Sequence, residues 1–235
     1  SLSIDNTTTS DLALSSNTAF YAELSRVLPV EQLYWRGRVH NFTDGYNWRA
    51  TSAPARRIEN IEIQDDSIIT STIKYEQNFS KDVIILDKPL NIIDSNSRIY
   101  SINSTNEKKL YAANKKIIFT ATSTLGIVGN TTELSNTEIK TYLQRPAFTP
   151  QLLKDINQKF KNLNSADKII STFSDYIVNE EFGYTLSPGP MPTMKSFLEK
   201  KVGYCTHFAS LLGMILRMND VPSRLVSGFQ GGIYN

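Results

Sequence analysis

The chain has 235 residues, of which 40% are hydrophobic and 20% are charged, and its formal net charge is +2. This length is sufficient for two domains with separate cores, while the scattered lysines and arginines form no basic stripe of the kind that nucleic-acid binding requires. Arg217 interrupts the longest apolar run, which therefore falls short of the about 18 residues needed to span a membrane. These features argue against a nucleic-acid partner and against a membrane span within this sequence.

Short strands dominate the first half of the chain. Apolar, β-branched and aromatic residues alternate with polar ones, and Asn, Ser and Asp clusters separate the runs. The runs cover residues 33–39, 58–63, 69–75, 83–86, 98–102, 110–112 and 116–122. This spacing predicts an antiparallel β-sandwich or barrel. We expect residues 1–128 to form an N-terminal β-rich domain, with the polar residues 1–11 frayed.

The hydrophobic period changes from two to about 3.6 after residue 130. Thr149-Pro150, Ser165 and Thr193 each stand where a helix is expected to begin. Residues 129–235 are therefore predicted to form a second, helix-rich domain. The predicted fold class is α+β, with an antiparallel β-sandwich-like domain followed by a helix-rich core.

Cys205 is the only cysteine of the chain, and it opens an apolar run that predicts a buried helix over residues 205–218. A turn at 219–222 and a strand at 223–229 follow. The positive end of a helix dipole favours the thiolate form of a cysteine, which is the nucleophilic form. Cys205 is therefore a candidate nucleophile. The simpler alternative is a buried and inert side chain, which is common for a lone cysteine on an apolar helix.

The residues around Cys205 resemble the motif of the transglutaminase-like branch of the papain-type thiol enzymes. That motif reads aromatic-Cys-x-x-Phe/Tyr-Ala, a helix, and then Pro-x-Arg-x-Val-x-Gly-Tyr/Phe. The matching residues here are Tyr204, Cys205, Phe208, Ala209, Pro222, Arg224, Val226, Gly228 and Phe229. Thr206 departs from the acidic residue that is common after the nucleophile, and Asn219-Asp220-Val221 departs from the usual small-Gly-Ile turn. The resemblance implies that Cys205 is the catalytic nucleophile.

The first half of the chain independently resembles the domain that precedes the transglutaminase core in TgpA-like bacterial membrane proteins. The matching segments are Ser10–Ser15, Ala19-Phe20, Leu33–Gly37, Asp44-Gly45-x-x-Trp48, Tyr75–Gln77 and Leu86–Pro89. The segment Phe182–Pro188 is similar to the Tyr-Thr-Leu stretch before the active site of that family. The resemblance implies an extracytoplasmic domain of a bacterial membrane protein, attached to the membrane through segments not in this chain.

In that family a His-Ala-Trp segment and an Asp-Pro-Thr segment supply the base and its orienting carboxylate. We expect residues 129–235 to be the N-terminal part of the core, truncated before both. Neither histidine of the chain replaces the base, because His207 lies two residues from Cys205, where helical neighbours point to different faces, and His40 lies in another region. Cys205 is the single predicted site residue, and the chain alone is expected to be inactive.

The resemblance implies an enzyme that attacks amide groups of proteins or peptides at the cell envelope through a thioester, giving transamidation or deamidation. Two alternatives stay open: a cysteine protease or amidase of the same fold, and a non-catalytic envelope interaction module with a degenerate core. No cofactor and no metal are expected, because the sequence has no Asp-x-Asp-x-Asp-Gly calcium loop and His207 has no second ligand nearby.

Four further residues have simpler structural interpretations. Trp35 and Trp48 are expected in the core of the sandwich. Arg224 is expected to form an ion pair or to bind carbonyl groups, and His207 to face solvent or to cap a helix. If the core normally continues its sheet past the strand at 223–229, an unpaired edge would favour self-association of the chain.

Overall fold

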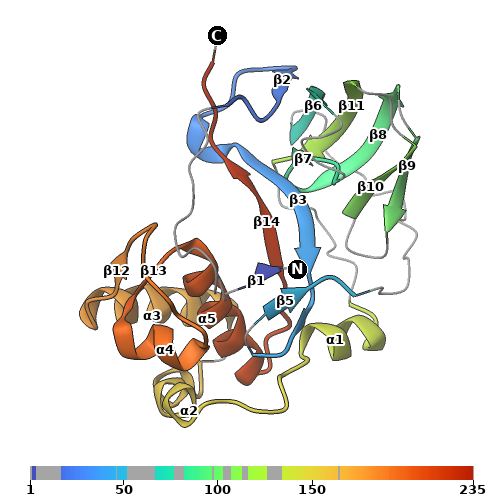
Figure 1. Cartoon of the computed structure of the whole chain (residues 1–235). Helices are drawn as coiled ribbons and strands as arrows, with labels where there is room; N and C mark the ends of the chain where they lie inside the picture. Colours follow the sequence, from blue (N-terminus) through green and yellow to red (C-terminus); the bar gives the residue numbers. More distant parts are fainter. Residues whose placement is uncertain are drawn as a thin grey trace. The chain divides into compact units, whose positions relative to one another are not determined.

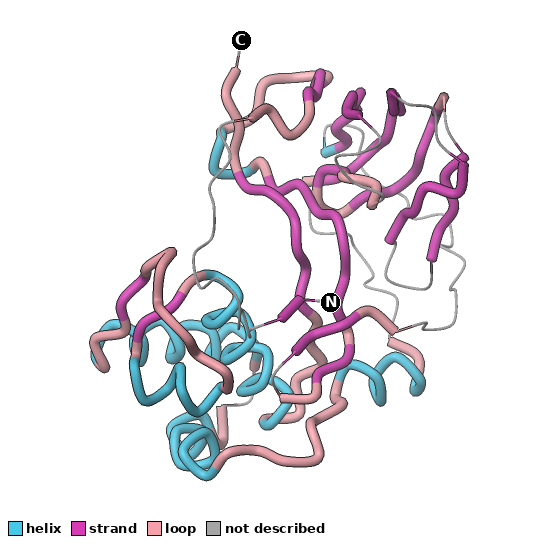
Figure 2. Tube along the Cα trace, in the orientation of Figure 1, coloured by secondary structure: helices cyan, strands magenta, loops and turns pink. Residues whose placement is uncertain are grey.

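The fold combines antiparallel sheets with a group of helices (Figure 1). It is seen in a computed structural model that describes residues 2–3, 17–45, 47–51, 67–76, 82–96, 98–102, 107–112, 116–125, 134–163 and 165–234. The strand predicted over 58–63 lies outside these ranges. Figure 2 shows helices in cyan and strands in magenta, and in Figure 1 the labelled α-helices have the yellow-green to red colours of the second half of the chain, where the hydrophobic period is helical. The predicted α+β class is therefore confirmed.

Two compact units share the chain, and they are interleaved along the sequence. The helical unit contains Ser1–Ser15, His40–Thr51 and Leu134–Leu225. The sheet unit contains Ser16–Val39, Ser52–Glu133 and Val226–Asn235. Short stretches of the first half therefore fold with the helices, and the last ten residues fold with the strands. The predicted domain boundary between residues 128 and 129 stays a prediction.

A four-stranded antiparallel sheet in the order β2-β6-β11-β8 is the main element of the sheet unit. Its strands are β2 (Tyr21–Leu24), β6 (Ile68–Glu76), β8 (Pro89–Ser95) and β11 (Lys116–Thr124). Buried and partly exposed residues alternate along β6 and β11, and the register places Ile73 opposite Phe119. This alternation follows from the period of two in the sequence, and it gives the sheet one apolar face.

A second, three-stranded sheet has the order β14-β3-β7, formed by β3 (Tyr34–His40), β7 (Ile85–Leu86) and β14 (Leu225–Gln230). A short 3-10 turn, η1 (Val30–Gln32), precedes β3, and β9 (Arg98–Ile102) pairs with β10 (Glu107–Ala112). Trp35 of β3 and Leu86 of β7 belong to the same buried cluster as Ile73 and Phe119. Because one core joins the two sheets, the unit is sandwich-like, as the strand spacing predicts.

The helical unit holds five helices and five short strands among its described residues. The helices are α1 (Asn136–Tyr142), α2 (Gln151–Asn157) with the 3-10 turn η3 (Gln158–Phe160), α3 (Ala166–Asn179), α4 (Met194–Lys200) and α5 (Cys205–Met218). The strands β1 (Leu2–Ser3), β4 (Phe42–Thr43) and β5 (Asn47–Arg49) form one antiparallel sheet, and β12 (Gly183–Tyr184) runs parallel to β13 (Val202–Gly203).

Side-chain caps explain where three of these helices begin. The hydroxyl oxygens of Ser135, Ser165 and Thr193 each accept a hydrogen bond from a backbone N–H in the first turn of α1, α3 and α4. The caps predicted at Ser165 and Thr193 are confirmed. Pro150 is itself the N-cap of α2, one residue later than the predicted Thr149 cap.

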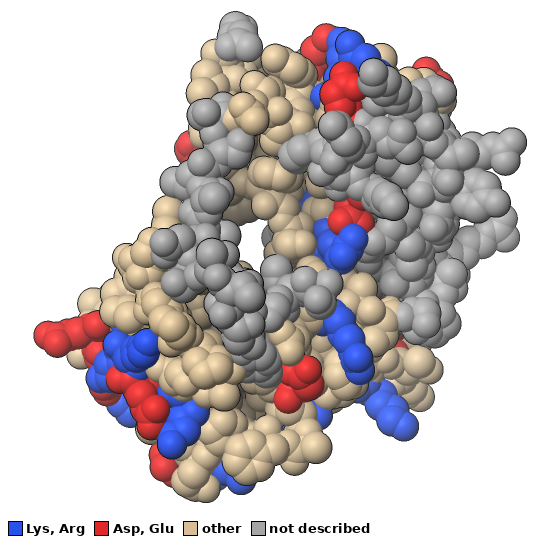
Figure 3. Space-filling view, viewed as in Figure 1, with Lys and Arg blue, Asp and Glu red and all other residues tan. Residues whose placement is uncertain are grey.

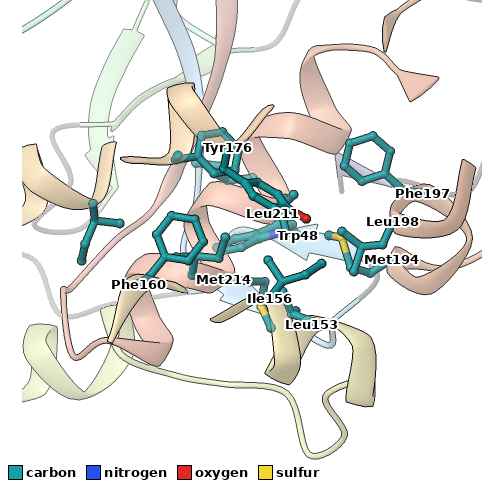
Figure 4. Close-up of a cluster of buried hydrophobic side chains, with 14 of the residues drawn as sticks. Trp48, Leu153, Ile156, Phe160, Tyr176, Met194, Phe197, Leu198, Leu211 and Met214 are labelled. Atoms are coloured by element: carbon teal, nitrogen blue, oxygen red, sulfur yellow. The ribbon is translucent and has the colours of Figure 1, made fainter. Parts of the chain in front are cut away.

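The core of the helical unit surrounds Trp48, which comes from β5 (Figure 4). Its indole ring is fully buried among side chains of α2, η3, α3, α4 and α5. Gly213 of α5 makes room for it, because a Cβ there would lie 3.2 Å from two atoms of the ring. The prediction that Trp48 is a core residue is confirmed, but its placement in the sandwich is wrong. Trp35 lies in the sandwich core as predicted.

Candidate active site

Cys205 is the first residue of α5, and its side chain is exposed. The chain leaves α4 through Lys201 in a left-handed conformation (φ 53°), forms β13, and reaches the N-cap Tyr204 in an extended conformation. Further along α5, in contrast to the exposed Cys205 side chain, Leu211 and Ile215 are fully buried. The helix is therefore anchored by its apolar face while its first residue presents a thiol to solvent. The alternative prediction that the Cys205 side chain is buried is therefore wrong.

Gly203 is required by the crowding of this turn. A Cβ at this position would lie 2.9 Å from the ring of Phe197 and 3.0 Å from Cγ of His207, closer than real Cβ atoms normally approach. The glycine two residues before Cys205 therefore allows α4 and α5 to meet closely. The packing of the turn thus determines the position of the thiol.

His207 is buried, with 1% of its surface exposed, and it packs inward from the third position of α5. Its Nδ1 accepts a hydrogen bond from the backbone N–H of Tyr204 at 3.2 Å. Burial lowers the pKa of His207 to about 4. The imidazole is neutral at pH 7, with its proton on Nε2. The capping role predicted for His207 is confirmed, and the alternative prediction of a solvent-facing ring is wrong.

The segment after α3 lies directly beside the Cys205 turn. Parallel pairing of β12 and β13 places Tyr184 opposite Gly203, and the Thr185 N–H donates to the Gly203 carbonyl oxygen at 2.8 Å. The exposed ring of Tyr184 stacks on Phe208, with centroids 6.3 Å apart and an interplanar angle of 19°. Phe208 is three residues after Cys205 on α5, so these two rings share the helix face of the thiol.

Arg217 is a structural residue that the sequence analysis missed. Its side chain is completely buried, and its guanidinium donates to the carbonyl oxygens of Asn41, Gln144 and Ser223. The ion-pair or carbonyl-binding role of Arg224 stays a prediction; its described contacts are with Tyr142, where Nη1 lies 3.5 Å from the phenol oxygen and the guanidinium 5.6 Å from the ring centroid. An arginine inside an otherwise apolar helix is the signal that points to position 217.

Charges of both signs are mixed on the face shown in Figure 3, over the helical unit. Glu180 accepts from Lys159 and Lys201, each at 2.9 Å, and these two ammonium groups hold the pKa of Glu180 at about 2. Lys195 and Glu199 form a further pair on α4. The absence of a nucleic-acid partner stays a prediction, but the described charges of this face form no single-sign patch.

Within the described ranges, no three His, Cys, Asp or Glu side chains come together as metal ligands would. The absence of a metal or other cofactor stays a prediction. A search of the same residues found no helix with the length and apolar character of a membrane span.

Residues 153–234, which include Cys205, match the family model of the transglutaminase-like superfamily. Among curated proteins, the chain is 35% identical over 60 residues to a protein-glutamine gamma-glutamyltransferase of Pseudomonas aeruginosa. It is 30% identical over 101 residues to the uncharacterized protein YebA of Bacillus subtilis. These alignments cover 24% and 40% of this chain but 9% and 14% of the two relatives, so the chain corresponds to a small part of each.

Two solved structures share the fold. The periplasmic domain of TgpA from Pseudomonas aeruginosa matches with a TM-score of 0.80 at 20% identity, over 100% of this chain and 82% of that chain. The same domain bound to ethylmercury matches with a TM-score of 0.75 at 20% identity, over 94% of this chain and 79% of that chain. The chain therefore has the fold of this domain, and the predicted resemblance to the transglutaminase-like family is confirmed.

Proposed function

We propose that the chain is the extracytoplasmic part of a transglutaminase-like enzyme in which Cys205 is the nucleophile. The substrates would be amide groups of proteins or peptides at the cell envelope. The observation that carries the proposal is the exposed thiol at the first residue of a long helix, inside the segment that matches the transglutaminase-like superfamily. The name of the Pseudomonas relative, a protein-glutamine gamma-glutamyltransferase, supports the glutamine carboxamide as acyl donor.

In the proposed reaction, the Cys205 thiolate attacks the amide carbonyl carbon and forms a carbon–sulfur bond. Negative charge develops on the carbonyl oxygen, and backbone N–H groups at the start of α5 are placed to stabilise it. The carbon–nitrogen bond then breaks, and the nitrogen takes a proton from the base and leaves as ammonia or an amine. An incoming amine resolves the thioester by transamidation, whereas water resolves it by hydrolysis, and either step restores the thiol.

The base is not supplied by either histidine of the chain in this proposal. His207 is buried, and its Nδ1 is engaged with the backbone N–H of Tyr204, while His40 is buried with 2% of its surface exposed. The proposal therefore assigns the base and its orienting carboxylate to a part of the protein outside this sequence. Activity is accordingly expected of the complete protein rather than of these 235 residues.

An extracytoplasmic location is part of the proposal. It is supported by the two structural matches, both of which are periplasmic domains. The proposed partners are envelope proteins or peptides, with membrane attachment through segments not in this chain.

The test uses the complete protein and measures two products from a glutaminyl peptide. We expect incorporation of a fluorescent primary amine together with release of ammonia, and loss of both in Cys205→Ala. Lys195→Ala, which changes an exposed ion pair on α4, is the matched control and should keep full activity. Full activity of Cys205→Ala would contradict the proposal and would leave the non-catalytic interaction module as the better explanation.

The same assay separates the enzyme classes. Both reactions release ammonia when the thioester forms, so formation of a glutamyl product in place of the amine conjugate indicates deamidation by water. Cleavage of the peptide backbone, seen by mass spectrometry and abolished in Cys205→Ala, indicates the protease or amidase of the same fold.

A further inference from the structure

We propose that His207 is a positioning residue for Cys205. Its ring accepts a backbone N–H and so holds the first turn of α5 in place. The other backbone N–H groups of this turn then stay available for the thiolate or for the oxyanion of the substrate. This inference rests on the proposed function for its biological meaning, but the geometry that supports it concerns the thiol alone.

The way α5 begins differs from the other capped helices of the unit. In α1, α3 and α4 a hydroxyl oxygen of the N-cap residue accepts a backbone N–H of the first turn. An oxygen in that position occupies the anion-binding end of the helix. The N-cap of α5 is Tyr204, an aromatic residue in place of the serine or threonine of the other three helices. At α5 the capping hydrogen bond is instead made by His207, the third residue of the helix, whose Nδ1 accepts the N–H of Tyr204.

This arrangement leaves specific donors available. The N–H groups of His207 and Phe208 are directed to the Tyr204 carbonyl oxygen at 2.9 and 3.5 Å. Within the described residues, the N–H groups of Cys205 and Thr206 have no acceptor. A helix whose first free donors surround a nucleophilic sulfur stabilises negative charge there. The Tyr204 N–H that His207 holds belongs to the Gly203–Tyr204 peptide, which directly precedes the peptide that carries the Cys205 N–H, so this bond restrains the backbone from which the donors at the start of α5 extend.

The imidazole is held firmly enough for this role. Its centroid lies 4.2 Å from the Tyr204 ring in an edge-on contact and 5.2 Å from the Phe197 ring. Gly203 permits this packing, since a side chain there would collide with both the Phe197 and the His207 rings. Tyr204 is a titratable group in contact with His207, and its pKa is raised mainly by burial. The neutral ring keeps the Nδ1 lone pair available at pH 7.

The experiment measures the alkylation rate of Cys205 by iodoacetamide from pH 5 to 10, using this chain, in which Cys205 is the only thiol. His207→Leu removes the acceptor, and His207→Met serves the same purpose if the leucine variant does not fold. His207→Gln keeps an oxygen that can reach back to the Tyr204 N–H, as glutamine does at this helix position. Phe197→Leu disturbs the same packing but keeps the acceptor.

We expect the rate at pH 7 to fall about fivefold in His207→Leu, the size expected for loss of one capping hydrogen bond, and the pH profile to move to higher pH. His207→Gln and Phe197→Leu should stay within about twofold of the original rate. An unchanged His207→Leu profile would overturn the inference. So would an equal fall in His207→Gln or Phe197→Leu, because ring volume or stability would then be the cause. Amide-directed activity is absent from this readout, so the two proposals can fail separately.

Discussion

The Nη2 of the Arg217 guanidinium donates a hydrogen bond at 2.8 Å to the carbonyl oxygen of Asn41, which lies 176 residues earlier in the sequence. The same group also lies 4.6 Å from the centroid of the Trp48 ring. In the described part of the chain, all of its acceptors are oxygens of uncharged groups. Burial lowers the pKa of Arg217 to about 10, so it remains charged at pH 7. One buried cation thus ties α5 to the β4–β5 segment.

Replacing this cation should be costly. Arg217→Met keeps much of the side-chain volume but leaves the buried carbonyl oxygens of Asn41, Gln144 and Ser223 without their donors. Buried unsatisfied groups of this kind cost about 1–3 kcal/mol each before relaxation, so we expect a loss of about 3–5 kcal/mol in the free energy of unfolding. Urea denaturation followed by circular dichroism measures this. Lys195→Ala is the control and should change stability by less than about 0.5 kcal/mol. A loss below about 1 kcal/mol in Arg217→Met would refute the structural role.

Steric crowding explains why β14, the strand after α5, has glycine at position 228. A Cβ at residue 228 would overlap the Trp35 carbonyl oxygen and lie 3.0 Å from the Cα of Arg36, so β14 crosses β3 with no room for a side chain. Gly228→Ala should therefore destabilise the sheet unit by about 3 kcal/mol. Gly232→Ala provides the comparison, because its new Cβ would meet its nearest neighbour at an ordinary 3.7 Å. Equal urea midpoints for the two variants would contradict the steric argument.

Protonation of His207 makes stability depend on pH. Its pKa is about 4 in the folded chain and about 6.5 when unfolded, so the unfolded state binds more protons between these values. Stability is therefore full above pH 6.5 and is lost as the pH falls towards 4. The expected loss between pH 7 and pH 5 is about 2 kcal/mol. In His207→Gln the side chain binds no proton in this range, so the free energy of unfolding should fall by about 2 kcal/mol less between pH 7 and pH 5. Urea denaturation at both pH values measures this difference. Parallel losses in the two proteins would contradict the prediction.

The free edge of β14 should promote self-association. Among the described strands, β14 has β3 on one side and none on the other, and Val226 is 48% exposed. Unpaired strand edges with apolar side chains pair readily with a second copy. We expect concentration-dependent dimers in sedimentation velocity, and about tenfold weaker association in Val226→Lys, because two lysines would approach each other across the antiparallel pair. Val178→Lys on α3, at a residue that is 74% exposed, is the control. A monomer at all concentrations would contradict this prediction.

Local signals predicted much of the fold. The α+β class, the helix over 205–218 and the caps at Ser165 and Thr193 all follow from short-range periodicity and hydrogen-bonding chemistry. The core in which Trp48 is buried could not be predicted in this way. The core that the Trp48 side chain enters is decided by contacts with residues more than a hundred positions away.

The candidate site was predicted only in part. Cys205 at the start of α5 is read directly from the pattern. Capping was one of two roles predicted for His207, and solvent exposure stayed open beside it, because a capping interaction is usually recognised from a serine or threonine at the N-cap, and Tyr204 stands there instead. The sequence analysis treated Arg217 only as an interruption of an apolar run. A charged residue on a helix that is apolar on nearly every face must be buried, and this signal was available.

The interleaving of the two units has a consequence for how the chain is made. During synthesis, the ribosome releases the sheet-unit residues 16–39 and 52–133 long before residues 226–235 that complete that unit. The helical unit likewise needs residues 40–51, which emerge early and have no core to join until α2 to α5 follow. Neither unit can therefore finish folding co-translationally while most of the chain is still unmade, and fragments cut at residue 128 would leave Trp48 without its helices and β3 without β14.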